Sequence, residues 1–395
     1  MSGPLAGIRV IDCSAVLSGP MATMMLADQG ADVIKVEQPG IGDYLRLSPF
    51  SRGGLGAFFV NGNRGKRAIT LDLRQPRGRD LLLALVRGAD VFVQNFRPGA
   101  VERLGIAEPD LRAVRPELVY VSISGFGESG PYASRRVYDP VIQALSGSVA
   151  IQVHPDSGER DLVRHVICDK ASALTAAQAI TAALFARERG AGGQHVRIAM
   201  LDASLAFFWP DGMMAHTMVG AGVERAGPTL YQLYRLTETA DGHLIYFAVS
   251  DAEFHGLFRA LGRPEWCEDD RFRELGPRIA HGAELEPMIR AAFRKWPTAE
   301  ILARMADESL PAAPALSLEE VIADPQVRHN DLLLEREHPS AGRIRQPRPP
   351  ARFDKTPAEA GRLAPLPGEH TDEILAELGV DGDERRRLRE AGVVA

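Results

Sequence analysis

One stretch near the beginning of the chain, residues 7–39, decides the fold: GIRVIDCSAVLSGPMATMMLADQGADVIKVEQP. Its β-branched beginning at 7–13 predicts a strand, and the segment 19–30 predicts a helix that ends at Gly30. Residues 31–39 predict a second strand. Because a helix joins the two strands, the stretch predicts a crossover connection between parallel strands.

The same alternation of strands and helices continues to about residue 200. We predict a helix and then a strand at 77–95, a strand at 116–124, a short helix at 139–147 and a strand at 194–200. This pattern is typical of an α/β fold whose mostly parallel sheet is covered by helices on both faces. We therefore expect a Rossmann-like large domain over residues 1–222.

The pattern changes after this domain. Residues 234–249 predict a hairpin that turns at Asp241-Gly242, and helical patterns follow at 251–262, 284–296 and 298–308. These elements predict a smaller α+β domain over 223–316. The remaining segment 317–395 holds many prolines between Pro339 and Pro367, which favour an extended arm over a packed element, and then two short helices.

Composition limits the function classes. The chain has 395 residues, enough for two hydrophobic cores, and its net charge of −6 argues against a nucleic-acid partner. Three cysteines form no disulfide framework, which suits a reducing cytoplasm. We expect no signal peptide and no membrane span, because the most apolar late segment is broken by Pro210, Asp211 and His216. Histidines and cysteines lack metal-binding spacing, so we expect no metal.

A glycine-rich motif, GFGESG at 125–130, follows a predicted strand. Dinucleotide binding requires a helix that opens within such a motif, but Pro131 and Tyr132 follow here. We therefore expect Gly125 and Gly127 to form a tight loop that lets the backbone approach another segment closely.

One carboxylate stands out in the stretch LVRHVICDKASALTAAQAITAALFARERG, residues 162–190. Asp169 follows a run at 162–168 that predicts a strand and precedes a helix of small and apolar residues, which implies burial. Capping of that helix is one explanation for an aspartate here. The other is a reactive carboxylate, whose pKa burial raises and the positive end of the helix lowers.

Basic residues are dense on the predicted loops of the large domain. They form either a solvated face or a cradle for a phosphate or diphosphate group. The set is Arg64, Lys66, Arg67, Arg74, Arg97, Arg103, Arg135 and Arg136.

Taken together, these segments resemble the class III coenzyme A transferases, also called the CaiB/BaiF or formyl-CoA transferase family. The resemblance covers nearly the whole chain. It is carried by residues 7–43, 63–79, 88–106, 118–133, 183–203, 317–333 and 366–379.

The resemblance implies a nucleophilic role for Asp169. In the family, an aspartate at this place attacks an acyl-CoA donor and forms a mixed anhydride, and coenzyme A thiolate then converts the anhydride to an enzyme-bound thioester. A carboxylic acid acceptor repeats these steps in reverse. The resemblance thus implies two small-molecule partners, an acyl-CoA that carries the coenzyme A and a small carboxylic acid.

The resemblance also assigns binding residues. Val16, Leu17 and Ser18 line the path of the coenzyme, while Arg103 and Arg136 face its phosphates. The other residues assigned to coenzyme A are Leu71, Asp72, Leu73, Arg74, Asn95, Phe96, Arg97, Arg135, Val137 and Tyr138, with Gln38 at the place of a basic residue of the family. The substrate pocket is assigned to Leu17, Tyr138, Gly125 and Gly127.

Family members are homodimers of two ring-like subunits threaded through each other, in which the C-terminal segment returns to the large domain. Two departures from the formyl-CoA and oxalate members stand out. The glycine-rich tract that closes over their site is missing here, and Leu17 replaces their pocket glutamine. The acceptor is therefore expected to be a larger or more apolar acid than oxalate.

Two other activities remain as alternatives. An α-methylacyl-CoA racemase pairs the aspartate with a histidine that precedes a second acid, but the matching step here is Tyr138-Asp139, and tyrosine is a poor base at neutral pH. A CoA-binding lyase or hydrolase is the other alternative, in which water replaces the acceptor acid.

Overall fold

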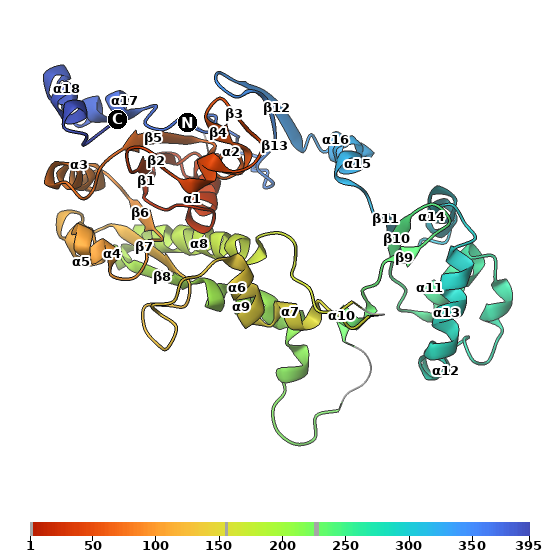
Figure 1. Ribbon diagram of the computed structural model, residues 1–395. Helices are drawn as coiled ribbons and strands as arrows, with labels where there is room; N and C mark the ends of the chain where they lie inside the picture. Colours follow the sequence, from red (N-terminus) through yellow and green to blue (C-terminus); the bar gives the residue numbers. More distant parts are fainter. Residues whose placement is uncertain (1–2, 155–156, 225–228) are drawn as a thin grey trace. The chain divides into compact units, whose positions relative to one another are not determined.

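The computed structural model, which describes residues 3–154, 157–224 and 229–395, divides the chain into two units (Figure 1). The large unit comprises Met1–Val223 and Asn330–Ala395, and the small unit comprises Glu224–His329. The C-terminal segment therefore belongs to the large unit. The helices α15 (Leu318–Ala323) and α16 (Pro325–His329), which the sequence placed in the segment 317–395, group with the small unit.

The large unit is built on a six-stranded sheet in which every neighbouring pair of strands is parallel. The strand order is β5-β2-β1-β6-β7-β8. The bounds are β1 Arg9–Asp12, β2 Asp32–Glu37, β5 Lys66–Thr70, β6 Val91–Gln94, β7 Val119–Ser124 and β8 His195–Ala199. The prediction of an α/β fold with a mostly parallel sheet is confirmed.

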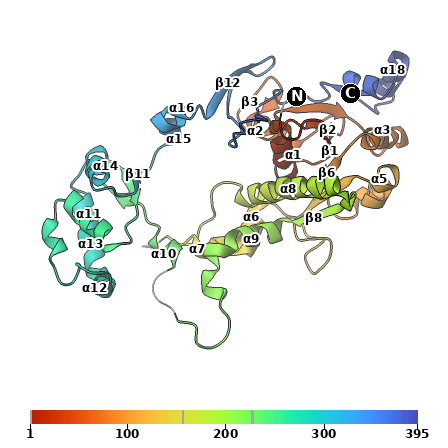
Figure 2. The same ribbon diagram turned by 180° about the vertical axis from the view of Figure 1, so that it is seen from behind.

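Helices cover both faces of this sheet. Val10 and Ile11 of β1 face opposite layers, because successive side chains of a strand alternate. The layer beside Val10 contains α1 (Ser18–Asp28), α6 (Asp139–Ser146), α8 (Ile167–Ala186) and α9 (Met200–Gly212) (Figure 1). The layer beside Ile11 contains α3 (Pro76–Arg87), α5 (Glu108–Val114), α17 (Thr371–Glu377) and α18 (Gly382–Glu390) (Figure 2).

The strand predicted at 162–168 is wrong. Residues 161–166 form no strand, and α8 begins at Ile167. The segment is not part of the sheet. Its backbone at Val163 hydrogen-bonds the side chain of Gln143 and not a neighbouring strand. The amide oxygen of Gln143 accepts from Val163 N at 2.9 Å and its amide nitrogen donates to Val163 O at 3.1 Å. An apolar extended run was therefore mistaken for a strand.

The arm between Pro339 and Pro367 also differs from the prediction of an extended, unpacked segment. It begins with a hairpin in which β12 (Leu333–His338) pairs antiparallel with β13 (Gly342–Pro347). Pro339 lies in the turn and Pro347 ends the second strand, so neither proline interrupts the ladder. Residues of the arm pack in one apolar cluster with β4 (Leu55–Gly56) and α2 (Ala57–Asn63).

The small unit has a three-stranded antiparallel sheet in the order β11-β10-β9. The predicted hairpin is confirmed, and Asp241 in its turn accepts a hydrogen bond from Thr298 N at 2.7 Å. Its strands are β9 Thr237–Glu238, β10 His243–Tyr246 and β11 Ala312–Pro314, and its main helices are α11 Asp251–Ala260, α12 Leu275–Ala280, α13 Gly282–Phe293 and α14 Thr298–Asp307. Among the described residues, no helix combines the length and the apolar character needed to cross a bilayer.

Candidate active site

The strand order reverses between β1 and β6, and the loops that follow these two strands come together there. Ligands of open α/β sheets bind at such a reversal, outside the carboxyl ends of the strands. Asn95, which follows β6, accepts a hydrogen bond from Ala15 N at 2.8 Å and donates one to Ala15 O at 2.7 Å. The fold therefore brings the segment with Val16, Leu17 and Ser18 beside the segment with Asn95, Phe96 and Arg97.

The loop after β1 has an unusual backbone at Val16. This residue has φ of 67°, in the left-handed region that β-branched side chains rarely adopt. The next residue, Leu17, is the N-cap of α1, and its own side chain makes no capping hydrogen bond. The strained residue thus lies at the point where the chain turns directly into α1.

Asp169 lies at the third position of α8 and is buried, with 7% of its surface exposed. Burial raises the pKa of its carboxyl to about 6, and the negative charge of Asp139 adds to the rise. Hydrogen bonding from the backbone and the hydroxyl of Ser18 acts in the opposite direction and lowers this pKa. The carboxylate is therefore poorly hydrated, yet remains mostly ionised at neutral pH.

Asp139, not Asp169, caps the N-terminus of α8. Its buried carboxylate accepts from Cys168 N at 2.7 Å and from Asp169 N at 3.0 Å. Gln143 holds this carboxylate in place by donating to it at 2.6 Å. The explanation of Asp169 as the cap of its own helix is wrong, because another carboxylate already satisfies those N–H groups.

Three helix N-termini meet around Asp169. Ser18 begins α1, Asp139 begins α6, and Asp169 lies in the first turn of α8. The N-terminal end of a helix carries a partial positive charge and favours an anion. This arrangement can stabilise the negative charge that develops on an oxygen during attack on a carbonyl.

The glycine-rich loop after β7 packs against the segment that leads to Asp139. A Cβ atom on Gly125 would lie 2.3 Å from Val137 Cγ1, so only glycine permits this approach. Gly127 has φ of 92°, and its N–H donates to Ser124 Oγ at 3.0 Å. The expectation of a tight loop at a close approach is confirmed.

Three of the basic residues that were candidates for phosphate binding are not accessible to a ligand. Arg64, Lys66 and Arg67 are buried and paired with Asp28, Asp12 and Asp32. These cations stabilise the fold of the sheet and are unavailable to a ligand.

The remaining cations of the set lie at the surface. Arg74 pairs with Asp72 at 2.8 Å, and Arg135 lies 3.8 Å above the ring of Tyr132. Within the described part of the chain, Arg97, Arg103 and Arg136 are exposed and make no ion pair, so they remain as candidates for phosphates.

The other assigned residues differ in their accessibility. Tyr138 is 69% exposed, and Gln38 is exposed as well. Leu17 and Leu71 are buried, whereas Leu73 and Phe96 are partly buried against the core. The side chain of Tyr138 is therefore accessible to a ligand, whereas the side chains of Leu17 and Leu71 lie beneath the surface.

Sequence reasoning missed the roles of Asp139 and of Ser18 toward Asp169. An Asp-Pro pair at a helix start was the one signal for Asp139, but the helix that Asp139 caps begins 28 residues later.

The thiol of Cys168, next to Asp169, is buried, and burial raises its pKa to about 11, so it is a poor nucleophile. Nowhere in residues 3–154, 157–224 and 229–395 do three His, Cys, Asp or Glu side chains gather as metal ligands.

Comparison with known proteins gives one consistent result. The sequence profile of CoA-transferase family III matches residues 5–371. The chain is 37% identical to the succinate–glutarate CoA-transferase of Agrobacterium fabrum over 384 residues, which cover 95% of this chain and 96% of that protein. It is 35% identical to the succinyl-CoA:mesaconate CoA-transferase of Haloarcula marismortui, over 96% of this chain and 97% of that protein.

A solved structure agrees with these sequence relatives. The crystal structure of a CaiB/BaiF family protein from Brucella suis superposes with a TM-score of 0.83 at 33% identity. The superposition covers 96% of this chain and 100% of that one.

Proposed function

Because the chain belongs to CoA-transferase family III and is a CoA-transferase, we propose that it carries the transferred groups covalently on Asp169. The observation that supports this role is a buried, ionised carboxylate at the meeting point of three helix N-termini, which does not cap its own helix because Asp139 does so. A carboxylate of pKa about 6 is more nucleophilic than an ordinary aspartate and is still mostly charged at pH 7.

The first half-reaction transfers coenzyme A to the enzyme. An oxygen of Asp169 attacks the thioester carbonyl of the donor, the C–S bond breaks, and coenzyme A leaves as a thiolate. The thiolate then attacks the aspartyl carbonyl of the mixed anhydride, the C–O bond breaks, and the donor acid leaves as a carboxylate. The enzyme holds an aspartyl-CoA thioester at this stage.

The second half-reaction reverses these steps with the acceptor. The acceptor carboxylate attacks the aspartyl thioester and expels the thiolate, which gives a second mixed anhydride. The thiolate then attacks the acyl carbon of the acceptor and releases the carboxylate of Asp169. One negative charge passes through every step, so no proton has to be supplied or removed. The positive N-terminal end of α1 stabilises the oxyanions.

Coenzyme A binding is assigned to the loops at the carboxyl ends of β1 and β6 and to the exposed cations nearby. The adjacency of the 15–18 and 95–97 segments supports this placement, and Arg97, Arg103 and Arg136 are free to meet phosphates. The phosphates supply the negative charge that exposed guanidinium groups bind.

The first substrates to test come from the relatives. Their names pair succinate or succinyl-CoA with glutarate or mesaconate, which are short dicarboxylic acids. The buried Leu17 favours an acceptor with an apolar carbon chain over oxalate. Succinyl-CoA with a panel of acids, read by mass spectrometry for new thioesters, tests the activity. Hydrolysis of succinyl-CoA at the same rate with and without every acid would instead support a hydrolase.

The alternative activity, that of a racemase, is tested with the same purified protein. The residue before Asp139 is Tyr138 and not a histidine, and Tyr138 is largely exposed. Deuterium uptake at the α-carbon of a 2-methylacyl-CoA in deuterated water, in the absence of any acceptor acid, would favour the racemase.

The acid side of the pH profile is expected to follow Asp169. Its pKa is raised to about 6, so the attacking carboxylate is lost as the pH falls through 6. We expect kcat/KM to halve near pH 6 and to fall about tenfold for each further pH unit. Steady-state rates between pH 4.5 and 8.5 measure this, with residual activity at pH 7.5 after each exposure as the control for unfolding. A profile that is flat down to pH 5 contradicts the assignment.

The active form is proposed to be an interlocked homodimer in the cytoplasm. Several large apolar side chains of the chain are strongly exposed, among them Phe50 at 94% and Val219 at 89%, and a second copy is the proposed cover for them. The free state of all three cysteines suits a reducing compartment.

Light scattering is expected to give about twice the chain mass of 42.9 kDa. Because interlocked rings separate only when a chain unfolds, tagged and untagged dimers should not exchange subunits under native conditions. Rapid formation of mixed dimers after simple mixing would exclude interlocking, and a monomer mass would exclude the dimer.

A further inference from the structure

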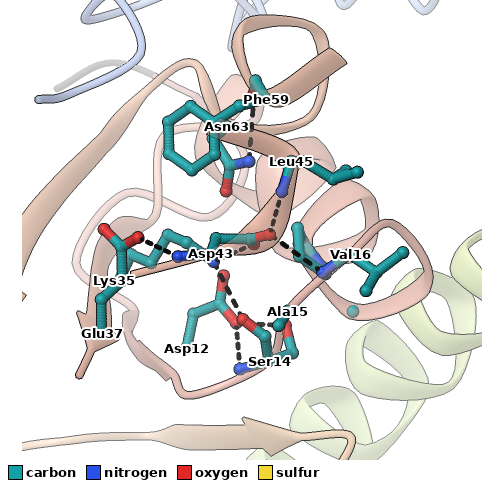
Figure 3. Close-up of polar contacts among 12 residues, drawn as sticks. Asp12, Ser14, Ala15, Val16, Lys35, Glu37, Asp43, Leu45, Phe59 and Asn63 are labelled. Atoms are coloured by element: carbon teal, nitrogen blue, oxygen red, sulfur yellow. Dashed lines mark hydrogen bonds and ion pairs between the residues drawn. The ribbon is translucent and has the colours of Figure 1, made fainter. Parts of the chain in front are cut away.

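Buried or partly buried side chains hold every backbone polar group from Ser14 N to Val16 N. Asp12 accepts from Ser14 N at 2.9 Å, and Lys35 donates to Ser14 O at 2.9 Å (Figure 3). Asn95 holds both polar groups of Ala15. Because side chains hydrogen-bond all of these backbone groups, the loop is restrained to one conformation.

Asp43 supplies the last of these contacts. One oxygen of its carboxylate accepts from Val16 N at 3.3 Å and from Leu45 N at 3.0 Å, and the other accepts from Lys35 Nζ at 3.1 Å (Figure 3). Asp43 and Lys35 are buried, and neither is among the residues that contact substrate in the proposed mechanism. The N–H that Asp43 holds belongs to the residue with the left-handed backbone.

The left-handed conformation of Val16 is costly for a β-branched residue and does not persist without support. It occurs two residues before Ser18, which begins α1, the helix that packs in one apolar cluster with α8, and whose backbone and hydroxyl lower the pKa of the Asp169 carboxyl. A relaxed Val16 would redirect the first turn of α1 and withdraw Ser18 from the nucleophile.

We propose that Asp43 is a positioning residue for Asp169, and that it acts by holding Val16 in the left-handed conformation that sets Ser18 against the nucleophile. This inference rests on the proposed function. Asp43 contacts neither substrate nor Asp169, and its influence passes through the backbone of residues 16–18.

Other charged groups lie near the carboxylates of Asp43 and Asp169. Asp43 lies beside Lys35 and Glu37, and the same buried network includes Arg46 and a second ion pair between Asp12 and Lys66. Asp169 has Asp139 as its charged neighbour and Cys168 as its titratable one. A change at Asp43 that alters the acid limb of the pH profile is expected to act through the loop, because the carboxylate of Asp43 hydrogen-bonds Val16 N, Leu45 N and Lys35 Nζ.

The test compares Asp43→Ala with the wild-type enzyme. We expect the acid limb of kcat/KM to move about one pH unit above 6, because Ser18 no longer stabilises the ionised form, and kcat to fall by about tenfold to a hundredfold. In the background of Val16→Gly, the same Asp43→Ala change is expected to lose about tenfold less, because glycine adopts the left-handed conformation without cost. An unmoved acid limb and an equal loss in both backgrounds would overturn the proposal.

A buried lysine without its partner can prevent folding, so a second variant removes both charges. Lys35→Met with Asp43→Leu replaces the ion pair by apolar side chains of similar size and leaves Val16 N–H without its acceptor. It is expected to show the same upward shift of the acid limb. The matched control is Arg64→Met with Asp28→Leu, which removes another buried ion pair without touching residues 14–18. The control is expected to lose stability and to keep its acid limb near pH 6.

A readout without turnover separates this inference from the proposed function. The change in unfolding free energy caused by Asp169→Asn reports the ionisation of Asp169 directly. We expect this change to grow in the Asp43→Leu, Lys35→Met background. If it grows while no covalent adduct forms on Asp169, the positioning role stands and the covalent mechanism fails. If the adduct forms but neither the acid limb nor this change moves, the positioning role alone is contradicted.

Discussion

Replacing Asp169 with asparagine is expected to reduce CoA transfer by about 10⁴-fold or more, the range seen when a covalent nucleophile is removed. Asparagine has nearly the same size, so the substitution leaves the packing around α8 in place. Its amide oxygen, however, cannot form an anhydride that thiolate reopens. The rate of glutaryl-CoA formation from succinyl-CoA and glutarate, followed by mass spectrometry, measures the loss.

The same variant has an expected control outcome in stability. Because the folded pKa of Asp169 is raised from 3.8 to about 6, the ionised group destabilises the fold. Stability is therefore lost as the pH rises from about 4 to 6, and about 3 kcal/mol is missing at pH 7, at 1.36 kcal/mol per pH unit. Asp169→Asn should recover up to this amount at pH 7 and nothing at pH 4. A variant that is inactive and less stable at pH 7 would point to a structural role instead.

Replacing Asp139 with alanine is expected to lower the free energy of unfolding by about 3 kcal/mol or more. Two buried N–H groups, of Cys168 and Asp169, lose their acceptor, and each unsatisfied buried group costs about 1–3 kcal/mol. Transfer activity should fall as well, because the first turn of α8 carries the proposed nucleophile. Urea denaturation at pH 7 measures the change.

Two comparisons separate the roles of Asp139. Asp381 caps α18 at the surface through Glu384 N at 2.8 Å, so Asp381→Ala is expected to cost only about 1 kcal/mol. Asp139→Asn keeps an acceptor but removes the charge that raises the pKa of Asp169, so the acid limb should move below pH 6. An acid limb that stays in place would show that the two carboxylates do not interact.

Continuous apolar runs predicted most of the sheet, because each of these strands is buried on both faces. Strand β5 was missed for a physical reason. Its first residues, Lys66 and Arg67, are charged, and their burial depends on Asp12 of β1 and Asp32 of β2. Nothing local in the sequence distinguishes these two residues from a solvated loop.

For the same reason, local sequence patterns predicted only part of the candidate site. Asp169 was proposed from its apolar helix and from the resemblance to a family, and the contacts of Asn95 bring together the two segments that are proposed to bind coenzyme A. The cap at Asp139 depends on a contact between two helices that start 28 residues apart, and the support of Val16 by Asp43 depends on a buried network. Such long-range partners cannot be read from local patterns.

Rapid quench with peptide mapping tests whether Asp169 becomes acylated in every turnover. The enzyme is mixed with succinyl-CoA, quenched in acid within milliseconds, digested and analysed by mass spectrometry. We expect a hydroxylamine-sensitive adduct on the peptide that contains Asp169, formed and consumed at rates at least equal to kcat once glutarate is present. An active enzyme that never shows a labile group on Asp169, or shows it on another residue, would rule out Asp169 as the covalent nucleophile.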